Sequence, residues 1–167
     1  MKRICLLTVM LTMLLTACGY KEGMYFKYNY NNIAEVNIYA NNDFYQKNID
    51  SDETKAFVKE VIDAIKDRDA GIDSIDGGSD TLNNVKILGN GNSRYIEIIF
   101  KNDINICHYK CTGNVKGKKY EYKDVSAFVV GFDGELTLIP GNPEMGNLYL
   151  GFGNEKKIKH IFDKWLQ

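Results

Sequence analysis

The connections between strand-like segments in the second half of this chain are too short for parallel pairing. Residues 125–132 and 135–139 flank Asp133-Gly134, whose residues suit the positive φ angles of a tight hairpin turn. Residues 95–100 follow Gly89-Asn90-Gly91-Asn92, a second strong turn signal. Because a parallel crossover needs about a dozen residues or more, these segments are expected to pair as antiparallel strands.

Two segments carry the 3.6-residue periodicity of amphipathic helices. The first follows Asp50, which is predicted to be the N-cap and to form a capping box with Glu53. The second follows Asn154, a favourable N-cap residue. The apolar stripes of the two helices are Phe57, Val58, Val61, Ile62 and Ile65, and Ile158, Ile161, Phe162, Trp165 and Leu166.

These elements predict an α+β fold. We expect an antiparallel sheet of about five to seven strands, covered on one face by the two helices, in a single domain over residues 32–167. Lys101-Asn102-Asp103 is expected to separate two strands, and residues 116–123 to form a loop. The other expected strands are residues 33–39, 82–88, 104–110 and 147–152.

The first residues of the chain have the order of a secretory signal. Lys2 and Arg3 precede an uncharged run, residues 4–17, that is too short to span a bilayer, which needs about 20 apolar residues. Leu15-Thr16-Ala17-Cys18 resembles the lipobox of bacterial lipoproteins, in which cleavage precedes a cysteine that carries a diacylglycerol thioether. The alternatives are a buried N-terminal helix, or a cleaved signal that happens to contain Cys18.

The lipobox resemblance implies that residues 1–17 are a lipoprotein signal peptide and that Cys18 is the lipidation site. The mature protein is then held by its N-terminal lipid in the cell membrane or outer membrane, facing outside the cytoplasm. Residues 18–31 form the lipidated tether. Part of this tether is expected to pack on the domain, because mobile linkers are usually poor in aromatic residues, and an interfacial anchor is the alternative. Its aromatic residues are Tyr20, Tyr25, Phe26, Tyr28 and Tyr30.

The layout of a strand, a capped helix and hairpins over residues 33–110 vaguely resembles small lipoproteins of Gram-positive bacteria with no assigned function. This resemblance rests on no specific motif and carries over no functional residue.

The charge balance argues against a nucleic-acid partner. The chain has 21 basic and 22 acidic residues and a pI of about 6.1, whereas nucleic-acid-binding domains are usually basic. Cleavage after Ala17 removes two basic residues and leaves 19 against 22, a net charge of −3. The expected partners are the membrane, through the lipid that the lipobox resemblance implies, and an unknown protein or envelope component.

Cys107 and Cys111 are candidates for a disulfide. Four residues along a strand cover about 13 Å, whereas a disulfide requires Cα atoms within about 7 Å. A bridge therefore needs the strand to fold back near Thr112-Gly113; two free thiols are the alternative. With only His108 and His160 in addition, these cysteines are too few for a typical zinc site. No metal and no cofactor are expected.

Two further motifs have simple structural explanations. An acidic segment after the first helix could bind Ca²⁺, but it lacks the glycine and the closing Glu of an EF-hand, so a solvated loop is favoured. Gly151-Phe152-Gly153 has no third glycine and no following βαβ unit, so a tight turn is favoured over a dinucleotide site. The acidic residues are Asp67, Asp69, Asp73, Asp76 and Asp80.

A lysine- and tyrosine-rich segment is the candidate partner contact. A solvated loop with Glu121 and Asp124 as local partners is favoured, and the functional alternative is a patch for anionic headgroups or wall polymers. The candidate contact residues are Lys116, Lys118, Lys119, Tyr120 and Tyr122, followed by Lys123.

Nothing in the sequence has the pattern of a catalytic site. Neither His108 nor His160 lies near a nucleophile motif, and no pattern brings Glu97 and Glu135 together. The favoured function is a non-catalytic binding or accessory module. The alternative is a small, hydrolase-like envelope enzyme that uses carboxylates assembled only in the fold. A solute receptor of a transporter is a weaker option, because such receptors commonly have two lobes.

Overall fold

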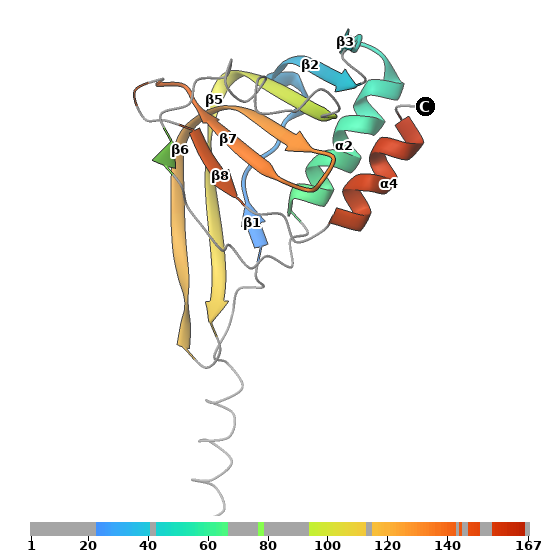
Figure 1. Cartoon of the computed structure of the whole chain (residues 1–167). Coiled ribbons are helices and arrows are strands. Elements are labelled where there is room, and N and C mark those ends of the chain that lie inside the picture. Colours follow the sequence, from blue (N-terminus) through green and yellow to red (C-terminus); the bar gives the residue numbers. More distant parts are fainter. Residues whose placement is uncertain are drawn as a thin grey trace, which may run out of the picture.

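A computed structural model describes residues 23–40, 43–66, 77–78, 94–112, 115–142, 144, 147–150 and 155–165. The lipobox, the acidic segment, the predicted strand 82–88 and Gly151-Phe152-Gly153 lie outside these residues. The described residues form an antiparallel sheet with two helices, so the predicted α+β class is confirmed (Figure 1).

One sheet contains every described strand, and all of its pairs are antiparallel. Six strands have four or more residues, which agrees with the predicted five to seven, and β1 and β4 are shorter. The strand order is β3 (Asp43–Gln46), β2 (Ile33–Ala40), β5 (Tyr95–Thr112), β6 (Val115–Gly131), β7 (Leu136–Pro140), β8 (Asn147–Leu150) and β4 (Gly77–Gly78), with β1 (Gly23–Tyr25) paired to β5.

The helices α2 (Asp52–Lys66) and α4 (Glu155–Trp165) lie next to each other and pack on one face of the sheet (Figure 1). The five predicted core positions of α2 are all buried, and so are three of α4. Phe162 contacts Phe132 edge to face, with ring centroids 5.5 Å apart. The core positions of α4 are Ile158, Ile161 and Phe162, whereas Trp165 is only partly buried.

The N-cap of α2 is Ser51, so the predicted Asp50–Glu53 capping box is wrong. The Ser51 hydroxyl oxygen accepts a hydrogen bond from the Thr54 backbone N–H at 3.1 Å, and the helix begins at Asp52. Ser and Asp are both good N-caps, and each has a polar residue three positions later, so sequence alone does not choose between them.

The strands β5 and β6 are much longer than predicted and form a hairpin arm that extends beyond the other strands (Figure 1). Residues 101–103 continue β5 instead of separating two strands, and residues 116–123 lie in β6 instead of a loop. The pairing of β5 with β6 shifts register between Ile99 and Ile104, and this irregularity accommodates the polar residues 101–103 within the strand. Polar residues are tolerated here because an antiparallel pair can satisfy its backbone while exposing its faces to solvent.

The segment predicted to be a tether is partly a component of the domain. Met24 is buried in the core, and Phe26 contacts Phe128 edge to face at 5.3 Å between ring centroids. The Tyr30 hydroxyl donates a hydrogen bond to the Ile49 carbonyl at 2.8 Å. The expected packing of this segment is therefore observed, and the domain boundary predicted at residue 32 is too late, because the sheet includes Gly23–Tyr25.

Candidate functional site

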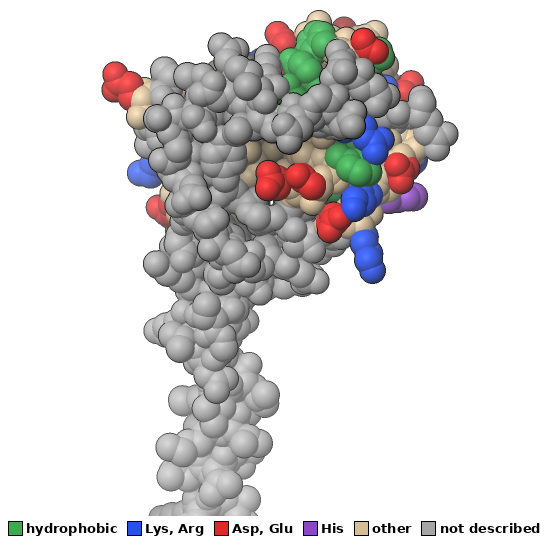
Figure 2. All heavy atoms as spheres, in the orientation of Figure 1, with side chains coloured by type: hydrophobic (Ala, Val, Ile, Leu, Met, Phe, Trp, Pro, Cys, Tyr) green, Lys and Arg blue, Asp and Glu red, His purple; other side chains and the backbone are tan. Residues whose placement is uncertain are grey.

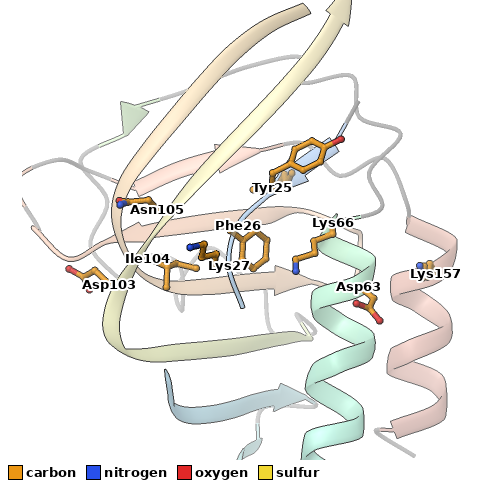
Figure 3. Close-up of a pocket in the computed structure, with 10 residues that line it drawn as sticks. Tyr25, Phe26, Lys27, Asp63, Lys66, Asp103, Ile104, Asn105 and Lys157 are labelled. Carbon is orange, nitrogen blue, oxygen red and sulfur yellow. The ribbon is translucent and has the colours of Figure 1, made fainter. Parts of the chain in front are cut away.

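A groove of about 1130 Å³ lies where the segment after β1 passes the C-terminal end of α2 (Figure 3). This volume is slightly above the roughly 300–1,000 Å³ of most small-molecule sites. The walls come from the first strand and the residues after it, from both helices, and from the irregular part of β5. The described residues that line it are Met24, Tyr25, Phe26, Lys27, Asp63, Lys66, Asp103, Ile104, Asn105 and Lys157.

An aromatic–lysine contact forms one wall of the groove. The side chain of Lys66 extends from the last turn of α2 toward Phe26, and its Nζ lies 4.8 Å from that ring centroid (Figure 3). The same amine lies 5.8 Å from the ring of Tyr28. Both distances allow cation–π attraction. Burial raises the pKa of Tyr28 to about 12, so this hydroxyl stays protonated at neutral pH.

The charged groups of the groove are mixed, with three lysines and two aspartates. Asp63 already has a partner outside the groove, because its Oδ2 lies 2.7 Å from Lys59 Nζ. Asp103 lies against the backbone of Gly141, where an added Cβ would be 2.1 Å from Asp103 Oδ2. Gly141 is further held by its N–H, which donates to the Asp124 carbonyl at 2.6 Å. The groove can therefore attract a ligand that offers negative charge and apolar surface.

A second polar cluster lies on the sheet face opposite the helices. Asn37 and Glu97 are only 3% and 2% exposed, and Asn37 Nδ2 donates to Glu97 Oε2 at 2.8 Å. The same amide is 3.3 Å from Glu35 Oε2. Beside them Tyr39 and Tyr95 stack with centroids 4.2 Å apart, and burial, followed by the neighbouring Tyr39, raises the pKa of Tyr95.

The two glutamates considered from the sequence have different partners. Glu97 is hydrogen-bonded to Asn37, whereas the pKa of Glu135 is raised by burial and by the charge of Asp133. No hydrogen bond joins Glu97 to Glu135, and the described part of the chain contains no group of three or more His, Cys, Asp or Glu side chains suited to a metal ion. The second cluster is therefore a buried carboxylate held by an amide rather than an acid–base pair, and the side-chain oxygen of Asn37 has no hydrogen-bond partner among the described residues.

The proposed disulfide lacks the geometry that it requires. Cys107 is a free thiol, and β5 continues as a strand through Thr112 instead of folding back before Cys111. Cys107 agrees with the alternative of free thiols, and the side chain of Cys111 lies outside the described part of the structure. Cys18, the predicted lipidation residue, lies outside the described residues.

The predicted partner-contact residues all lie on one strand of the hairpin arm. Lys118 is the register partner of Lys110, and Lys119 that of Tyr109. Tyr120 and Tyr122 are opposite His108 and Ile106, and Lys116 is in the same strand, β6. His160, in contrast, is exposed on α4.

The groove residues were not identified from the sequence. Lys27, Asp63, Asp103 and Lys157 come from four separate segments, and no spacing in the chain joins them. The one available signal was Lys66, a cation in the last turn of a predicted helix, which is a common position for lysine in any helix.

Comparison with protein-family models, curated proteins and solved structures finds no match to this chain. Neither α2 nor α4 is long and apolar enough to cross a membrane, nor is any other helix among the described residues.

Proposed function

We propose that this protein is a lipid-anchored, non-catalytic binding or accessory module on the outer side of a bacterial cell membrane or outer membrane. One observation carries the proposal: the sheet begins at Gly23, only five residues after the lipobox cysteine, Cys18. An extended chain covers at most about 3.5 Å per residue, so these five residues span no more than about 18 Å. The domain would be held at the headgroup region instead of at the end of a long linker.

The groove supports binding as the activity of this module. The segment that leads from the proposed anchor into the domain also supplies one groove wall, through Met24, Phe26 and Lys27. A ligand in the groove would therefore be bound close to the membrane surface. The lysines, together with aromatic and aliphatic side chains, offer both charge and contact area to a protein or an envelope component.

The hydrolase-like alternative receives less support from the same groove. Such an enzyme would use two carboxylates facing one substrate, with at least one pKa raised by its surroundings. Asp63 is paired with Lys59, and Asp103 comes from a different wall of the groove, on β5. Besides these two aspartates, the described lining contributes three lysines and apolar groups and no histidine, so binding explains the groove more simply than hydrolysis does.

Three versions of the full chain test the anchor. Wild type and Cys107→Ala should both be found in the membrane fraction and incorporate a labelled fatty acid. Cys18→Ala should lose the label and accumulate as an uncleaved precursor, because the acceptor thiol is missing. Cys107→Ala is the matched control, since it also removes a thiol but leaves the lipobox intact. Equal labelling of Cys18→Ala and wild type would refute the proposal.

A further inference from the structure

The tip of the β5–β6 hairpin is a basic segment in an otherwise slightly acidic protein. Residues 108–120 contain four lysines and no Asp or Glu, whereas the whole chain has a net charge of −1. All four lysines lie within paired strands, two of them directly opposite each other as Lys110 and Lys118. Like charges at opposite positions destabilise an antiparallel pair, so a nearby anionic surface would stabilise this arrangement.

The direction of β1 places this tip on the side of the anchor. Gly23 pairs with Tyr109 and Tyr25 with Cys107, so Gly23 is the end of β1 nearest the hairpin tip. From Tyr109 the strand has three more residues before it ends at Thr112, a distance of about 10 Å. In Figure 1, β1 lies beside the projecting arm, between the arm and the two helices.

We infer that the hairpin tip, residues 108–112 and 115–120, rests on an anionic phospholipid surface beside the lipid anchor. This inference rests on the proposed function, because the acylated Cys18 brings the surface within reach. An anchor no more than about 18 Å from Gly23 keeps the tip close to the headgroups. Attraction between charges is strong within a Debye length of about 8 Å. The favoured orientation of the domain is therefore the one that brings the hairpin tip to the lipid headgroups.

The expected size of the effect follows from the charge of the tip. An anionic leaflet stabilises the charged form of each nearby lysine. The fraction of neutral amine is therefore roughly five-fold lower than on a neutral surface. Because acylating reagents attack only the neutral amine, each tip lysine should react roughly five-fold more slowly on anionic lipid. Lysines far from the tip should react at the same rate on both surfaces.

Lysine labelling of the full lipidated protein in nanodiscs tests this inference. Labelling rates from mass spectrometry are compared between phosphatidylcholine discs and discs that also contain phosphatidylglycerol. Lys116, Lys118 and Lys119 are expected to react roughly five-fold more slowly in the anionic discs. Lys55 and Lys59 are the internal controls, because α2 begins beside β3, far from the hairpin tip (Figure 1). In 1 M salt, where the Debye length is about 3 Å, the difference should disappear.

The possible outcomes separate the explanations. Equal labelling of the tip in both discs, or equal slowing at Lys55, would overturn the inference. Slowing of the tip by an added anionic wall polymer, without any effect of lipid charge, would assign the surface to the cell wall and also overturn it. The N-terminal peptide is measured in the same digest. An unacylated Cys18 would refute the proposed function, whereas an acylated Cys18 with equal tip labelling would refute this inference alone.

Discussion

Truncation of Phe162 should remove much of the stability of the domain. Phe162 is fully buried, and its ring packs edge to face on Phe132 with the ring centroids 5.5 Å apart. This contact packs α4 against the end of the sheet. Truncation of a buried Phe typically costs about 3–5 kcal/mol. This is a large share of the roughly 5–15 kcal/mol that stabilises a typical domain. For a domain of about 150 residues, the melting temperature should fall by roughly 6–20 °C.

The measurement is urea unfolding of Phe162→Ala monitored by far-UV circular dichroism. Fluorescence is avoided because the emission of the nearby Trp165 would respond to the substitution itself. Asp163→Ala is the matched control, since the neighbouring side chain is exposed and its loss should change the unfolding free energy by less than about 0.5 kcal/mol. A loss below about 1 kcal/mol in Phe162→Ala, or one equal to the control, would show that α4 is not part of the cooperative core.

Two further predictions concern the pH dependence of stability through Glu60 and the effect on function of substituting other acidic and histidine side chains. Hydrogen bonds from Lys164 and, to a smaller extent, Trp165 lower the pKa of Glu60 below its usual 4.5. These bonds therefore stabilise the folded protein fully above pH 4.5, and this stabilisation is lost as the pH falls through the lower pKa of the folded state. In acid unfolding, Glu60→Gln should therefore lose less stability than wild type below pH 4.5, and parallel curves would contradict this linkage. In a deletion strain with a phenotype, Glu97→Gln and His160→Ala should each restore function in proportion to the amount of folded protein. Complete loss of function in one of these variants, while it remains folded, would favour the enzyme.

The sequence was sufficient for the parts of the fold that depend on local pattern. The stripes of α2 and α4 were predicted from their periodicity, and the β6–β7 turn from Asp133-Gly134, where Gly134 has a φ of 89°. The length of the arm was missed because, apart from the short pairing of β1 with residues 107–109, its two strands pair only with each other, and residues 116–123 contain few apolar side chains.

The groove could not be predicted because it is a product of tertiary packing. Phe26 and Lys66 are forty residues apart and meet only after β1 has paired with β5 and α2 has packed on the sheet. The choice of N-cap was ambiguous for a different reason, since Asp50 and Ser51 are adjacent and similarly favourable as caps. The contacts that form the groove are absent from any local window of the sequence, whereas the Ser51–Thr54 hydrogen bond is local and has an equally plausible neighbour in Asp50 and Glu53.

We propose that the chain is anchored through lipid at Cys18, five residues before β1. The most direct measurement is the mass of the N-terminal tryptic peptide from the membrane-extracted wild type. We predict a peptide of residues 18–21 whose cysteine carries a diacylglycerol thioether. A peptide that begins at any other residue, or an unmodified Cys18, would contradict the claim.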